Sequence, residues 1–192
     1  EGVVGRHGEV ERHDELAARD EVAGGDRVAE RDALPVQRGL DGQAGVAHEM
    51  LAAARHVRRF GLEPKIALCS HSQFGNLETE SGRRMREALA ALDAREPDFS
   101  YEGEMHIDAA LDQGIRDRIF PGGRFEGTAN VLVFSNADAA SGVRNILKMR
   151  AGGLEVGPIL MGMGNKAHIV TSSITARGLL NMSAIAGTPV TH

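Results

Sequence analysis

The sequence predicts an α/β fold in which a mainly parallel sheet is covered by helices on both faces. Short apolar runs alternate with segments whose apolar residues recur at helical spacing, as in βαβ units. Of the 192 residues, 42% are hydrophobic but only 4% are aromatic, and there is no Trp. We therefore expect a core of aliphatic side chains in a domain of ordinary size.

The first part of the chain differs from the rest in composition. Residues 1–40 are rich in Glu, Asp, Arg, Gly and Ala, and their large apolar side chains besides Val are Leu16, Leu34 and Leu40. Such a segment buries little apolar surface. We interpret residues 1–45 as a charged, mobile arm that stays outside the α/β core, and residues 46–192 as the domain.

Helical and strand-like segments then alternate along the domain. Helical spacing predicts helices over Val46–Phe60, Ser81–Leu92, Ile107–Ile119, Ala139–Met149 and Thr175–Ala186. Apolar runs predict strands over Ile66–Cys69, Phe99–Met105, Ala129–Phe134, Val156–Met161 and His168–Thr171.

Ligands of parallel α/β sheets bind beyond the carboxyl ends of the strands. The polar loops that follow predicted strands are Ser70–Asn76, Ser135–Asp138 and Thr171–Arg177. We expect all three loops to gather at one edge of the sheet.

These loops contain side chains suited to a polar, phosphorylated ligand, and each has a plainer explanation. Hydroxyl groups and glycine-permitted backbone approach favour phosphate or pantetheine oxygens in the first loop, although a serine-rich strand end also satisfies its own backbone donors. The side chains after the third predicted strand could bind a ligand or cap the next helix. The last loop precedes a helix N-terminus, where either a bound anion or a capping side chain is favourable. The candidate ligand-binding residues are Ser70, Ser72, Phe74, Gly75, Asn136, Asp138, Ser172, Ser173, Thr175 and Arg177.

Several classes of function receive no support from the sequence. A net charge of -5 and few aromatic residues argue against nucleic-acid binding. Apolar runs well short of about 20 residues argue against a membrane span. A single Cys cannot form an intramolecular disulfide, which favours a cytoplasmic protein. The single Cys69 ends an apolar run, so we expect a buried, inert thiol. Histidine spacing gives no metal motif. His71 and His106 could act as a pair of bases for hydrolysis, but there is no G-x-S-x-G motif, so we expect each to be a surface residue or one with its hydrogen bonds satisfied.

Six motifs together resemble a known family. They are Pro64–Gly75, Arg84–Leu89, Gly103–His106, Ala129–Phe134, Gly157–Leu160 and Arg177–Met182. In order and spacing over about residues 50–190, they resemble the phosphotransacetylase-like C-terminal region of bacterial NADP-dependent malic enzymes, within the phosphate acetyl/butyryltransferase family.

The resemblance implies a three-layer α/β/α fold of the phosphotransacetylase (isocitrate dehydrogenase-like) type, present here in part. It implies that the parent protein oxidatively decarboxylates malate to pyruvate, with NADP and a divalent metal held by upstream domains and no cofactor in this chain. A CoA thioester, the upstream malic enzyme domains and further copies in a homo-oligomer are the implied partners.

The chain departs from catalytic members of that family at one motif. Those members carry a Ser-Arg-Gly turn followed by an acidic residue, whereas here Ser173 is followed by Ile174, and Gly178 lies near where the acid would fall. The resemblance therefore favours a region without catalytic residues that binds acetyl-CoA, regulates the parent allosterically and supports its oligomerisation. The alternative is an active phosphate acetyltransferase, in which Arg177 partly replaces the missing charge.

Overall fold

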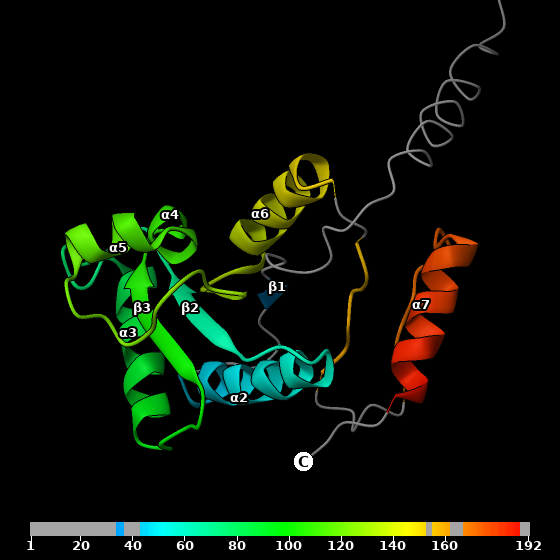
Figure 1. The fold of residues 1–192 in the computed structure, drawn as a ribbon, viewed down its shortest axis with the longest axis horizontal. Helices are drawn as coiled ribbons and strands as arrows, with labels where there is room; N and C mark the ends of the chain where they lie inside the picture. Colours follow the sequence, from blue (N-terminus) through cyan, green and yellow to red (C-terminus); the bar gives the residue numbers. More distant parts are fainter. Residues whose placement is uncertain (1–33, 37–42, 153–154, 162–166, 189–192) are drawn as a thin grey trace, which may run out of the picture. The chain divides into compact units, whose positions relative to one another are not determined.

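A computed structural model describes residues 34–36, 43–152, 155–161 and 167–188. In this part, four strands form one sheet in the order β1-β4-β2-β3, and every neighbouring pair is parallel (Figure 1). The strands are β1 (Leu34–Val36), β2 (Lys65–Cys69), β3 (Ser100–Met105) and β4 (Val131–Phe134). The predicted α/β fold with a parallel sheet is confirmed.

Six helices are described alongside the sheet. They are α2 (Gln43–Arg59), α3 (Glu80–Asp93), α4 (Ile107–Leu111), α5 (Gln113–Ile119), α6 (Ala137–Arg150) and α7 (Ala176–Gly187). Four of the predicted helices form with small shifts at their ends. No helix in the described ranges combines the length and apolar character needed to cross a bilayer.

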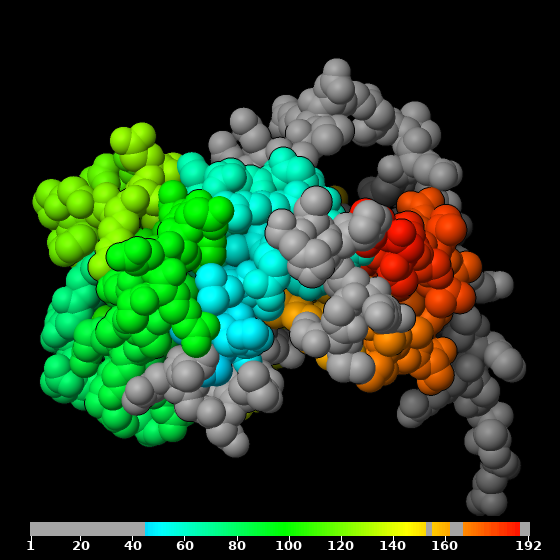
Figure 2. Space-filling model, turned by 90° about the horizontal axis from the view of Figure 1, so that it is seen from below, coloured from blue at the N-terminus to red at the C-terminus, as the bar shows by residue number. Residues whose placement is uncertain are grey.

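The central strands are buried on both faces because successive side chains of a strand point to opposite sides. On one face, α2 and α3 pack against Ile66, Leu68, Val131 and Val133. On the other, α4, α5 and α6 pack against Ala67, Cys69, Leu132 and Phe134. The domain therefore has three layers, with α2 (cyan) adjoining the α3–β3 region (green) on the surface shown in Figure 2.

The helical period over Ile107–Ile119 is interrupted, contrary to expectation. Asp112 has extended backbone angles, and its Oδ1 accepts a hydrogen bond of 3.0 Å from the Ile115 amide. This carboxylate acts as an N-cap, so α5 begins as a new helix instead of continuing α4.

The expectation that the chain up to Leu40 stays outside the core is wrong for β1. Leu34, Pro35 and Val36 pair with residues 131–133 of β4. Parallel pairing needs only backbone groups in register, which amino-acid composition does not report. Residues 43–45 of the expected arm form the start of α2, and residues 1–33 and 37–42 lie outside the described part.

Two of the expected strands are also wrong. In their described residues, neither Val156–Met161 nor His168–Thr171 forms a strand. Ile169 in the second segment is 73% exposed. Local β propensity is present there, but a strand also requires a neighbouring strand, and neither segment pairs with the four-stranded sheet.

β3 approaches β2 closely at one glycine. A Cβ atom on Gly103 would lie 2.7 Å from Leu68 Cβ and 2.8 Å from the Leu68 carbonyl oxygen. The pairing register between the two strands shifts at this level, between Leu68 and Cys69. The edge strand can therefore pack here only without a side chain.

We predict that Gly103→Ala destabilises the fold by about 1–3 kcal/mol or more, because the added methyl group meets buried atoms of β2 that cannot move freely. Gly142→Ala in α6 is the matched control, since nothing lies within 4 Å of its Cβ position. Alanine favours a helix over glycine, so this control is expected to keep or raise stability. Urea unfolding followed by circular dichroism measures both, and equal stabilities would contradict the close-approach argument.

Candidate functional site

Two of the three predicted loops leave the sheet at the same edge. β2 ends at Cys69 and β4 ends at Phe134, and these two residues are partners in the parallel register. Loops Ser70–Asn76 and Ser135–Asp138 therefore start side by side, as predicted. The third loop, Thr171–Arg177, does not follow a strand, so its place beside the other two stays a prediction.

The Ser70–Asn76 loop is held by short-range hydrogen bonds. Ser70 Oγ accepts from the Ser72 amide at 2.8 Å, and the Ser70 amide donates to the Met105 carbonyl at 3.0 Å. The Gln73 amide donates to Asn76 Oδ1 at 2.8 Å. Part of the hydroxyl and amide chemistry of this loop thus stabilises the loop itself.

A buried carboxylate connects this loop to β3 and α3. The Glu104 side chain is only 1% exposed, and its Oε1 accepts from Ser72 Oγ at 2.6 Å, from the Gly75 amide at 2.9 Å and from Arg86 Nη1 at 3.0 Å. The Phe74 amide donates to the Glu104 carbonyl at 2.6 Å. The edge strand therefore fixes the backbone of the loop that follows its neighbour β2.

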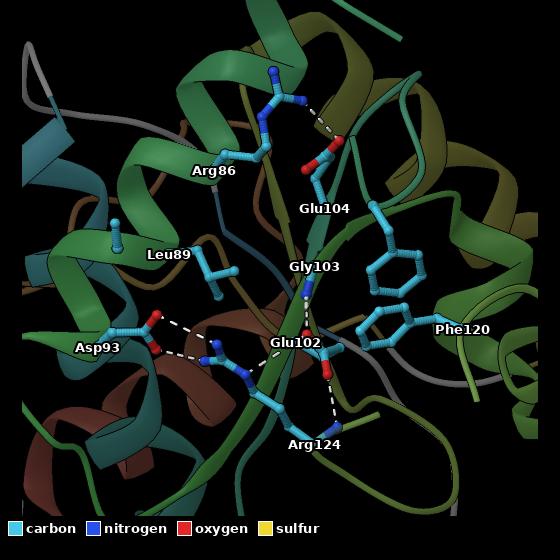
Figure 3. A pocket seen from close by; sticks show the side chains of 10 residues that line it. Arg86, Leu89, Asp93, Glu102, Gly103, Glu104, Phe120 and Arg124 are labelled. Atoms are coloured by element: carbon cyan, nitrogen blue, oxygen red, sulfur yellow. Dashed lines mark hydrogen bonds and ion pairs between the residues drawn. The ribbon is translucent and has the colours of Figure 1, made fainter. Parts of the chain in front are cut away.

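A pocket of about 370 Å³ adjoins this carboxylate. Its two ends carry charged pairs, Arg86 with Glu104 at one and Asp93 with Arg124 at the other (Figure 3). Phe74 and Phe120 stack with ring centroids 4.4 Å apart. The lining residues are Phe74, Arg86, Leu89, Ala90, Asp93, Glu102, Gly103, Glu104, Phe120 and Arg124.

The second end of the pocket is organised by Glu102, which is also buried. Its carboxylate accepts from the Arg124 amide at 2.6 Å and from the Gly103 amide at 3.1 Å. Arg124 donates to Asp93, and this hydrogen bond holds the pKa of the Asp93 carboxyl below its usual value. Both arginines of the pocket are thus already paired with carboxylates, so an anionic ligand would have to displace a pair.

The predicted binding residues of the other two loops are mostly exposed or act as caps. Asn136 Oδ1 accepts from the Ala139 amide at 2.8 Å and caps α6, while Asp138 lies exposed in the first turn of that helix. Thr175 Oγ1 accepts from the Gly178 amide at 3.0 Å and caps α7. Ser172, Ser173 and Arg177 are exposed, as is Gly75, whereas Phe74 is half-buried. A ligand role for these residues stays a prediction.

Sequence reasoning did not single out the groups that organise the pocket, which are Arg86, Glu102, Glu104 and Arg124. It considered His71 and His106 as a pair of bases and set that role aside, and the structure does bring the two together, with their rings stacked and the centroids 6.2 Å apart. A ring nitrogen of His106 lies 2.9 Å from the His71 carbonyl oxygen. No group of His, Cys, Asp or Glu side chains suited to a metal ion occurs within the described ranges.

Comparison with known proteins decides the family. The family model described as phosphate acetyl/butaryl transferase matches residues 44–187. The chain belongs to this family. It is 42% identical over 147 residues to the NAD-dependent malic enzyme of Rhizobium meliloti (strain 1021), and 42% identical over 142 residues to the NADP-dependent malic enzyme of Escherichia coli (strain K12).

These alignments cover 77% and 73% of this chain but 19% of each malic enzyme. The chain thus spans about a fifth of their length, and it is a phosphotransacetylase-like domain of the kind that malic enzymes contain. The EutD phosphotransacetylase from Staphylococcus aureus has the same fold, with a TM-score of 0.74 at 23% identity over 82% of this chain and 50% of that one. The resemblance read from the motifs is confirmed.

We predict that Glu104→Gln destabilises this phosphotransacetylase-like domain by about 1–3 kcal/mol, because a neutral amide weakens three hydrogen bonds to a buried acceptor. Glu78→Gln is the matched control, since Glu78 pairs with the same Arg86 from a side chain that is 83% exposed. This exposed pair should contribute less than about 1 kcal/mol. If the two variants lost the same stability in urea unfolding, the organising role of Glu104 would be contradicted.

Cys69 has the environment of an inert thiol, as predicted. It is buried, and burial raises the pKa of the thiol to about 12. We predict that Ellman's reagent at pH 8 leaves the folded protein unlabelled and labels one thiol per chain after unfolding in urea, because the thiolate is the reactive form. Rapid labelling of the folded chain would show that the β2 thiol is open to solvent.

Proposed function

We propose that this chain is a non-catalytic, acetyl-CoA-binding region of a malic enzyme that regulates the decarboxylation of malate by the rest of the parent protein. The observation that carries the proposal is the chemistry of residues 167–188, which contain several hydroxyl side chains and Arg177 but no Asp or Glu. This segment suits an anionic ligand, and it lacks a carboxylate base.

Anion binding is supported by the start of α7. The unpaired amides of a helix N-terminus and the helix dipole favour a negative group. Ser172, Ser173 and Arg177 are exposed just before and within the first turn of this helix, so a ligand can reach them. The phosphates and carbonyl groups of a CoA thioester have the chemistry that these donors fit.

The proposed lack of acetyl transfer is supported by the carboxylates of the pocket, which are already engaged in hydrogen bonds. Transfer between CoA and phosphate needs a base to deprotonate the thiol and a cation to neutralise the phosphate. Ile174 and Gly178 supply neither, and the buried Glu102 and Glu104 already accept hydrogen bonds in the pocket. The domain thus has the fold of a transferase, while residues 167–188 supply no carboxylate that could act as the base.

The parent activity is inferred from the relatives. Malic enzymes 42% identical over this region are named as NAD-dependent in one case and NADP-dependent in another. We assign the binding of malate, of a nicotinamide cofactor and of a divalent metal to domains upstream of this region. The motifs of this chain indicate that the cofactor is NADP. We assign support of a homo-oligomer to this region itself.

An active phosphate acetyltransferase is the second candidate, favoured by one observation. Arg177 lies exposed in the first turn of α7, where its guanidinium could neutralise a phosphate in place of the missing arginine. Acetyl transfer would then need a base from another group.

We predict that the intact parent enzyme binds acetyl-CoA in calorimetry and releases little CoA thiol when phosphate is added. Arg177→Ala should weaken binding by about 1–3 kcal/mol if it donates a charge-assisted hydrogen bond. Arg150→Ala, an exposed cation at the end of α6, is the control and should leave binding unchanged. Absence of binding, or acetyl phosphate formation at roughly 1–1000 per second, would overturn the proposal.

A further inference from the structure

Unpartnered buried nitrogens gather at the end of α2. Eight buried side-chain nitrogen or oxygen atoms in the described part lack a hydrogen-bond partner, and five of them belong to three residues. These are Nδ1 of His56, Nε and Nη1 of Arg59, and both ring nitrogens of His168. We call His56, Arg59 and His168 the α2 basic cluster.

The cluster joins α2 to the segment that precedes α7. Arg59 Nη2 donates to the Thr188 carbonyl at 2.5 Å, which ties the end of α7 to α2. Met161 packs against the hydrophobic core that contains Val57 of α2. Burial lowers the pKa of His56, and so do the nearby charges of Arg59, His168 and Arg55.

Nitrogens without acceptors are more numerous here than at the other arginine sites. Arg58, Arg86, Arg124 and Arg144 each pair with at least one carboxylate, and the buried Arg116 donates to three backbone carbonyls, with its Nε left unpartnered. In the described contacts of the α2 basic cluster there is no carboxylate, and the one acceptor is the Thr188 carbonyl. Each buried donor without an acceptor costs about 1–3 kcal/mol, so a group that accepts several hydrogen bonds and carries negative charge would relieve the cost.

We propose that the α2 basic cluster binds a small tetrahedral oxyanion of the phosphate class between α2 and residues 167–170. The Nε and Nη1 atoms of Arg59 can donate to two oxygens of such an anion, and an imidazole nitrogen of each histidine can donate to another. The orphan nitrogens are closed to water in this conformation. Entry of the anion therefore requires His168 to move slightly away from α2.

Two sources share this chemistry, which are free inorganic phosphate and a phosphoryl group of a CoA compound. The second source rests on the acetyl-CoA binding proposed above, and the first does not. The residues involved are different from the hydroxyls and Arg177 at the start of α7, so the two sites can be tested separately.

The test is a titration of the full 192-residue chain with inorganic phosphate. The readout is the NMR signals of the ring Cε1–H groups of His56 and His168. We expect both signals to shift with saturation. The pKa of His56 should rise when phosphate is bound, because an anion favours the imidazolium form. Sodium chloride at matched ionic strength should not reproduce the saturation. If either signal fails to shift with saturation, or if chloride produces an equal response, the proposal is overturned.

Two variants separate binding from general effects on the fold. Arg59→Gln should weaken phosphate binding roughly tenfold or more, since it removes the charge that the hydrogen bonds need. Arg58→Gln is the matched neighbour, whose guanidinium pairs with Asp98 and Glu63, and it should leave binding unchanged. If Arg59→Gln does not fold, as judged by its amide spectrum, His168→Gln provides the same comparison. Equal affinities in all variants would contradict the site.

The source of the anion follows from a competition experiment. If coenzyme A displaces phosphate and shifts the same two histidine signals, the phosphoryl group is the ligand. If phosphate binds and coenzyme A does not compete, the ligand is the free ion, and acetyl-CoA binding at α7 is decided by calorimetry alone. If acetyl-CoA binds in calorimetry but neither ligand moves the histidine signals, the proposed function stands and the oxyanion site is refuted.

Discussion

The arrangement of the candidate site depends on the burial of one charged group, the carboxylate of Glu104. Removing a carboxylate from water is costly unless several donors replace the lost hydration. Here one oxygen accepts three hydrogen bonds, from the side chain of Ser72, the backbone of Gly75 and the guanidinium of Arg86. Those donors belong to the loop after β2 and to α3, so the three hydrogen bonds to this oxygen fix both of them against β3, while the second oxygen, Oε2, has no hydrogen-bond partner.

The same strand supplies a second fixed point. Glu102 holds the backbone of Arg124, whose guanidinium reaches Asp93 at the end of α3. The helix is therefore held to the edge strand near its middle, through Arg86, and at its C-terminal end, through Asp93, and the pocket of Figure 3 lies between these two contacts. An edge strand covered in this way also presents less free backbone for unwanted pairing.

The sequence was sufficient for features that arise from local periodicity. Helix α3 and strands β2 and β4 follow directly from apolar spacing and apolar runs, and their register then places two polar loops at one edge. It was insufficient where structure depends on partners far away in the chain. The segment His168–Thr171 has strand-like residues but pairs with no strand of the sheet, whereas Leu34–Val36 forms a strand by pairing with β4.

The site itself could be predicted only in part, for a related reason. Hydroxyls and glycines in loops are visible in a sequence; of the residues predicted in this loop, Phe74 lines the pocket, and Ser72 and Gly75 donate to Glu104 beside it. Glu102 and Glu104 stand in a segment that alternates like an ordinary strand, where charged residues are expected to face water. Their burial depends on Arg86 and Arg124, which approach from other elements, and no spacing rule connects those positions.

Family membership and local chemistry point in different directions at the end of the chain. The fold is that of phosphotransacetylases, yet residues 167–188 contain no Asp or Glu that could act as a base. The regulation by acyl-CoA that we propose would retain the fold without needing this base. In that proposal the loop after β2 is ordered before a ligand binds, through its hydrogen bonds to the buried carboxylate of Glu104.

Amide hydrogen exchange of the unliganded chain tests this ordering most directly. Phe74 and Gly75 lie in a loop, but their amides donate to the carbonyl and to the carboxylate of Glu104. The account predicts that both amides exchange much more slowly than the amide of Gly122, which lies in an exposed turn after α5. Exchange of Phe74 and Gly75 as fast as that of Gly122 would show that the buried carboxylate does not hold the loop.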